Sequence, residues 1–152
     1  MKLAEALQER ADINRKINEL TTRIKQNCLV QEGESPNEAP ALLIDELNSC
    51  IDRLQYLISS INKTNNTVQV NGRTLTDIIA EKDAANIRLN SYRQFVNEAG
   101  NRTQRSRFSE IKIMCAVNVI ELQRTADGYA KRVRELDNLL QQANWTTELI
   151  EN

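Results

Sequence analysis

Four long segments of the sequence repeat apolar residues every three or four positions, and this periodicity constrains the fold most. The clearest repeat runs through 119–143, where the apolar residues are Leu122, Ala126, Tyr129, Val133, Leu136, Leu140 and Ala143. Spacings of four and three place such residues along one side of a helix, as in coiled coils. Similar repeats predict helices over 2–27, 41–65 and 75–99. We therefore expect a mainly α protein with four long helices, in a bundle or coiled-coil-like arrangement.

The ends of these helices carry local signals. Gly33, Pro36 and Pro40 interrupt the pattern between the first two helices and predict a loop. Thr74, followed three residues later by Asp77, resembles a capping box, and Asn118 with Glu121 suggests a second helix cap. In the segment 41–65 two stripe positions stay open, because either Cys50 or Ile51, and either Leu57 or Ile58, fits the repeat.

Two short segments alternate apolar and polar residues instead, as strands do. One is 67–70, which ends at the turn-forming pair Asn71-Gly72; the other is 110–117. A lone strand leaves its backbone groups unpaired. We therefore expect the two segments to pair with each other as a small two-stranded antiparallel ribbon, with Asn71-Gly72 redirecting the chain into the next helix.

Length and composition favour one non-catalytic domain. A chain of 152 residues with 40% hydrophobic content is long enough for a single core, so we expect one helical domain over 1–152. The sequence has no histidine, which excludes Ser-His-Asp triads, imidazole bases and His-containing metal sites. It also has no Gly-rich phosphate loop of standard spacing. We expect no enzymatic activity and no cofactor.

The cysteines and the apolar runs bear on the compartment. Cys28, Cys50 and Cys115 are widely separated and form no CxxC pair, so we expect reduced thiols rather than disulfides or a zinc site. No signal-peptide pattern and no run long enough to span a bilayer is found. We expect a cytoplasmic protein without a membrane partner. Trp145 is expected to pack the C-terminal tail onto the helices.

Several motifs together resemble one protein family. They are MKLAEALQERADI, LVQEGESP, INKTNN, NGRTLTDIIAEKDA, SEIKIMCAVNV and RELDNLLQQANWTTELIE. These stretches are similar to a family of small bacterial helical proteins labelled septicolysin-like, and the match covers nearly the whole chain. The resemblance implies no catalytic residues. The label itself implies a pore-forming toxin, which is one alternative function.

Two further functions follow from the residues. Long apolar stripes and few aromatic residues favour self-association, as a homodimer or higher homo-oligomer, with any other protein partner unknown. The alternative is binding of RNA or a phosphorylated ligand by the basic loop 102–112. Arg102, Arg105, Arg107 and Lys112 supply the guanidinium and ammonium donors that phosphate oxygens accept. A net charge of −1 argues against nucleic acid as the general partner.

Overall fold

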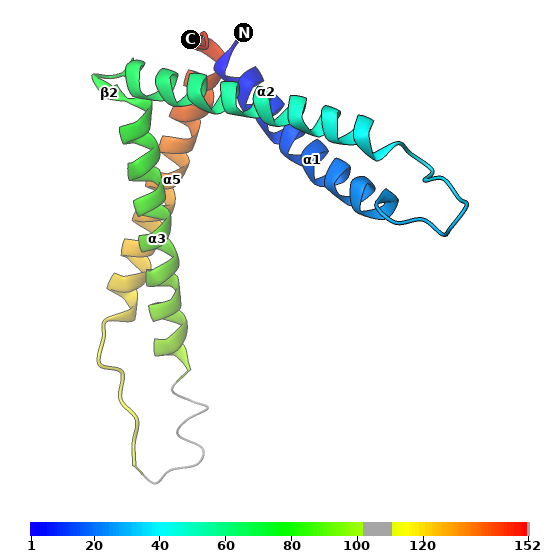
Figure 1. Cartoon of the computed structure of the whole chain (residues 1–152). Coiled ribbons are helices and arrows are strands. Elements are labelled where there is room, and N and C mark those ends of the chain that lie inside the picture. The colour runs from blue at the N-terminus through cyan, green and yellow to red at the C-terminus, as the bar shows by residue number, and fades with distance from the viewer. Residues whose placement is uncertain (102–110, 152) are drawn as a thin grey trace. The chain divides into compact units, whose positions relative to one another are not determined.

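The computed structural model describes residues 1–101 and 111–151, which form four helices and two short strands. In chain order these elements are α1 (Leu3–Asn27), α2 (Pro40–Thr67), β1 (Gln69–Val70), β2 (Arg73–Thr74), α3 (Leu75–Gly100) and α5 (Val119–Thr146) (Figure 1). The prediction of a mainly α fold with four long helices and a two-stranded antiparallel ribbon is confirmed.

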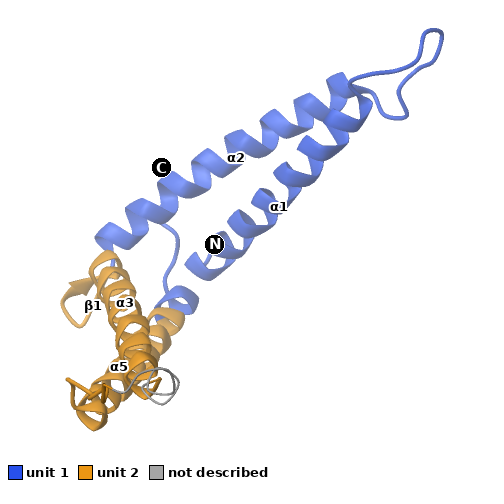
Figure 2. Cartoon of the chain, turned by 90° about the horizontal axis from the view of Figure 1, so that it is seen from below, with its two compact units in different colours: residues 1–68, 143–152 blue, residues 69–142 orange. Residues whose placement is uncertain are grey.

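The chain divides into two compact units. Unit 1 contains residues 1–68 and 143–152, and unit 2 contains residues 69–142 (Figure 2). Unit 1 is therefore built from both ends of the chain, and the last turn of α5 belongs to it. The expectation of a single domain stays a prediction, which a folding experiment proposed below tests.

In unit 1, α1 and α2 form an antiparallel pair joined by the loop 28–39, whose charged residues are all acidic (Figure 1). Ion pairs lie along the edge of this pair: Nε and Nη2 of the Arg53 guanidinium donate to the Glu9 carboxylate at 2.7 and 2.8 Å. Lys16 lies 2.6 Å from Glu46. The loop is anchored by the buried side chain of Asn27, whose Oδ1 accepts from the backbone N–H of Glu38 at 3.0 Å.

The two ends of the chain are tied together within unit 1. The Leu3 N–H donates to the Thr147 carbonyl at 2.9 Å, and the Leu149 N–H donates to the Met1 carbonyl at 2.8 Å. Leu149 is only 7% exposed, whereas Trp145 is 64% exposed. The expectation that Trp145 packs the tail is therefore wrong: Leu149, a smaller side chain three residues beyond the end of α5, does so.

In unit 2 the strands β1 and β2 form a hairpin. Gln69 pairs with Thr74 and Val70 with Arg73. Asn71 and Gly72 connect them with φ angles of +53° and +77°, the left-handed conformation that a tight two-residue hairpin needs. Thr74 ends the hairpin and starts α3, and its Oγ accepts from the Asp77 N–H at 3.1 Å while its own N–H donates to the Asp77 carboxylate. The predicted capping box is confirmed.

The predicted partner of this strand is wrong. Segment 67–70 was expected to pair with 110–117, but β1 pairs with the residues that follow it directly, and 111–117 contains no strand. Asn71-Gly72 closes the hairpin rather than merely redirecting the chain. The physical reason is loop closure: a two-residue turn orders far less chain than pairing segments forty residues apart. Residue 110 lies outside the described residues.

The remainder of unit 2 is the pair α3 and α5, which run side by side (Figure 1). Tyr92 of α3 and Tyr129 of α5 meet with ring centroids 5.7 Å apart, and the Arg88 guanidinium lies 5.8 Å from the Tyr129 ring centroid. The Lys82 ammonium lies 2.5 Å from the Asp137 carboxylate. The start of α5 is capped as predicted, since the Glu121 N–H donates to Asn118 Oδ1 at 3.2 Å.

Candidate functional site

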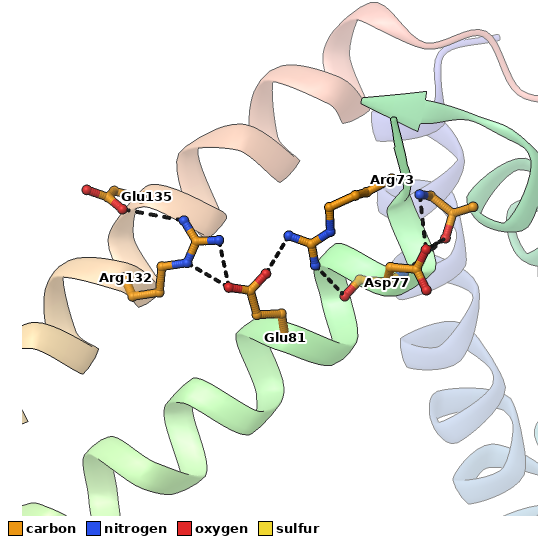
Figure 3. Close-up of polar contacts among 6 residues, drawn as sticks. Arg73, Asp77, Glu81, Arg132 and Glu135 are labelled. Carbon is orange, nitrogen blue, oxygen red and sulfur yellow. Dashed lines mark hydrogen bonds and ion pairs between the residues drawn. The ribbon is translucent and has the colours of Figure 1, made fainter. Parts of the chain in front are cut away.

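A cluster of charged side chains in unit 2 centres on Glu81, which pairs with two arginines. Arg132 of α5 donates to one Glu81 oxygen through Nε at 2.7 Å and lies 2.6 Å from it through Nη2. Arg73 of β2 lies 2.6 Å from the other oxygen. Figure 3 shows both guanidinium groups directed at this one carboxylate, with Glu135 beside Arg132.

This cluster joins β2, α3 and α5, and the charged groups in it are paired with one another. Hydrogen bonds from Arg73, and then from Arg132, hold the pKa of Glu81 below its ordinary value of 4.5. Both arginines already have a carboxylate partner, so an external anion would have to compete with Glu81 for them. We interpret the cluster as a structural clamp that fixes β2 and α5 to α3.

The ion pairs of Glu81 should make the stability of the fold depend on pH. Because the folded-state pKa of Glu81 is lowered, its ion pairs stabilise the fold above pH 4.5, and this stabilisation is lost as pH falls through the lowered pKa. The variant Glu81→Gln should therefore melt below the wild type at pH 7, with the difference shrinking at pH values under 4.5. Melting temperatures measured from pH 2 to 7 check this. An undiminished difference at pH 2 would show that charge is not the cause.

The residues predicted to hold phosphate are largely outside the described part of the chain. Arg102, Arg105 and Arg107 all fall there, whereas Lys112 is described and exposed. Residues 113–117, which directly follow Lys112, line a cavity of about 360 Å³ together with the end of α3. Its lining is mainly apolar, and of the described residues that line it the charged one is an acid, Glu98. This chemistry disfavours an anionic ligand in that cavity.

Metal-ligating side chains do not gather in the described residues. Over 1–101 and 111–151 no group of three or more Cys, Asp and Glu side chains is placed to hold an ion. Cys28, Cys50 and Cys115 are free thiols; Cys28 is exposed and the other two are half-buried. Within the same residues no helix combines the length and the apolar character that crossing a bilayer requires.

One face of α2 exposes large apolar side chains to solvent. Ile44, Ile51 and Ile58 are 43%, 43% and 41% exposed. Spacings of seven place them on one side of the helix, and half-buried Leu47 and Leu54 fill the positions between them. These five residues form an apolar band, named here the α2 stripe. At 1.5 Å per residue it extends about 21 Å from Ile44 to Ile58.

A row of uncharged amides borders the α2 stripe. Asn48, Gln55 and Asn62 each follow a stripe isoleucine by four residues, so they are its neighbours on the helix surface, and all three are exposed. An amide carries both donors and an acceptor. An apolar band edged by polar, uncharged side chains has the composition of a protein–protein contact rather than of a solvated face.

Sequence periodicity alone could not identify this face. Cys50 and Ile51, and likewise Leu57 and Ile58, were left as alternatives for the same stripe. Leu57 is fully buried and Cys50 half-buried, whereas Ile51 and Ile58 stay accessible. In each pair, therefore, one residue is the more buried and the other belongs to the accessible face of α2. The available signal was the width of the stripe, which exceeds what one neighbouring helix covers.

Comparisons with known proteins agree with the fold and name a family. The sequence profile of the Family of unknown function (DUF6847) matches residues 10–149. A solved structure, described as a functionally unknown conserved protein from Corynebacterium diphtheriae, superposes with a TM-score of 0.92 at 34% sequence identity. That match covers 99% of each chain. No curated protein matches the sequence. Neither description mentions a septicolysin, so that resemblance stays a prediction, and the chain belongs to the Family of unknown function (DUF6847).

Proposed function

We propose that this protein is a non-catalytic helical interaction protein that self-associates, most simply as a homodimer in the cytoplasm. One observation carries the proposal: the α2 stripe presents three isoleucines with more than two fifths of each side chain accessible, at heptad spacing. Burying apolar surface is the main favourable contribution to association. The free thiols fit a reducing compartment.

The hairpin of α1 and α2 gives a second reason. Helices α1 and α2 pack against each other along one face each, so a side chain at the edge of that contact is covered from one side only. Ile13 and Ile17 of α1, like Leu47 and Leu54 of α2, remain half-buried. A second apolar helix face laid on this margin would complete the burial, as the additional helices of a four-helix bundle do.

A charge placed in the centre of the stripe tests the proposal. Ile51→Lys should convert the protein from a dimer to a monomer, because a dimer would have to bury an unpaired ammonium at its interface. Light scattering coupled to gel filtration should then give the chain mass of 17.4 kDa at micromolar concentrations where the parent gives twice that mass.

The matched control is Ile87→Lys on α3, which changes an isoleucine that is 67% exposed and lies in unit 2. The control should keep the parent mass. Equal loss of the dimer in both variants would mean that added charge, rather than the α2 stripe, governs assembly. If the Ile51→Lys variant were folded and still dimeric, the α2 stripe would not be the dimer interface.

A further inference from the structure

The charges along α2 and the loop before it separate by sign. Every charged residue in 28–52 is acidic, and every charged residue in 53–68 is basic. Two of the acids are paired within the hairpin, Glu38 with Arg23 and Glu46 with Lys16. Glu32, Glu34 and Asp45 are exposed and have no side-chain partner among the described residues. Negative charge therefore concentrates near the start of α2.

This distribution discriminates between the two ways in which two copies of α2 can pair. In a parallel pair the uncompensated acids of both copies lie at the same end, and like charges held close together repel. In an antiparallel pair the acidic start of each α2 lies away from that of the other copy, beside a later half whose charged residues, Arg53 and Lys63, are basic. Arg53 is already paired with Glu9 and Lys63 with the Glu151 carbonyl, so the gain is the separation of like charges rather than new ion pairs. The helix macrodipoles also oppose each other favourably in that arrangement.

The apolar register fits the same arrangement. Ile44 and Ile58 lie seven residues on either side of Ile51. A two-fold axis passing beside Ile51 and perpendicular to α2 sets Ile51 against its own copy and Ile44 against the other copy's Ile58. The stripe is then self-complementary, as a two-fold interface requires.

The amide row removes the usual obstacle to pairing a surface with itself. Residues at the edge of a two-fold interface meet residues of the same edge, so a row of one charge would repel itself. Asn48, Gln55 and Asn62 carry no charge and can each donate to and accept from another amide. The chemistry at this edge thus suits a second copy of the same helix.

Resting on the self-association proposed above, we propose that the partner of the α2 stripe is α2 of a second copy. The two helices lie antiparallel across a two-fold axis beside Ile51, and the two α1/α2 hairpins together form an intermolecular four-helix arrangement. Left-handed packing of this kind brings the residues at the seam within disulfide reach at matched positions.

Disulfide trapping tests the arrangement. In a full-length chain whose own cysteines are replaced (Cys28→Ser, Cys50→Ala and Cys115→Ser), single cysteines are introduced as Ile44→Cys, Ile51→Cys or Ile58→Cys. After mild oxidation, Ile51→Cys should form a covalent dimer by itself. Ile44→Cys and Ile58→Cys should form little alone and should cross-link when the two variants are mixed, as denaturing, non-reducing electrophoresis shows.

The control is Ser49→Cys, an exposed position of α2 away from the stripe, which should not cross-link. Efficient cross-linking of Ile44→Cys alone and of Ile58→Cys alone would establish a parallel pair and overturn the inference. A cysteine-replaced parent that is dimeric but gives no stripe cross-link would also overturn it, while leaving self-association standing. A folded parent of monomer mass would overturn both proposals.

Discussion

Leu57→Ala is expected to lower the free energy of unfolding by about 3 kcal/mol, since truncating a fully enclosed leucine removes its transfer energy and leaves a cavity. Leu57 lies in unit 1 and has no exposed surface. Ile78→Ala, at an equally buried position of unit 2, should cost a similar amount. Chemical denaturation followed by circular dichroism measures both, with Ile87→Ala as the exposed control that should cost less than about 1 kcal/mol.

These two variants also test whether the units unfold together. Helix α5 is continuous across the boundary between Gln142 and Ala143, so melting one unit would fray a helix of the other. We therefore expect one cooperative transition that both substitutions shift. Two transitions, one moved by Leu57→Ala and the other by Ile78→Ala, would show that the chain is two domains.

Removing residues 147–152 is expected to destabilise unit 1 by about 4 kcal/mol, from loss of a buried leucine and of internal hydrogen bonds. Leu149 is 7% exposed. Its N–H donates to Met1, and the Ile150 N–H donates to the buried Thr64 hydroxyl at 2.9 Å. Thermal melting of the truncated and full-length chains at equal concentration makes the comparison.

The control for the truncation separates backbone pairing from charge. Glu148→Gln removes the ion pair with Lys2, which lowers the pKa of Glu148, but it keeps Leu149 and the backbone bonds. Because Glu148 is two thirds exposed, this substitution should change the melting temperature little. If Glu148→Gln and the truncation had the same effect, charge rather than packing would hold the tail.

The helices could be predicted because their signals are local. Apolar spacing located all four, and the pairs Thr74 with Asp77 and Asn118 with Glu121 marked two starts that the structure confirms. The partner of β1 could not be predicted in this way. Alternation of side chains shows that a segment is extended, but it carries no information about which segment donates the opposing hydrogen bonds.

The α2 stripe and the terminal tie were missed for different reasons. Ile51 and Leu57 are both apolar and both fit a helical repeat, so their separate environments depend on where α1 lies. The hydrogen bond between Leu149 and Met1 joins backbone groups, which every residue has, so no pattern of residue types predicts it. Arg102, Arg105 and Arg107 stay candidates for phosphate contact outside the described residues.

The molecular mass of the unmodified protein tests self-association most directly. Sedimentation equilibrium over a dilution series through the micromolar range should give twice the chain mass of 17.4 kDa at the upper concentrations, falling toward the chain mass on dilution. A dimer joined by apolar burial behaves in this way because dissociation follows mass action. A mass of 17.4 kDa at every concentration would contradict the account and leave the α2 stripe without a second copy to cover it.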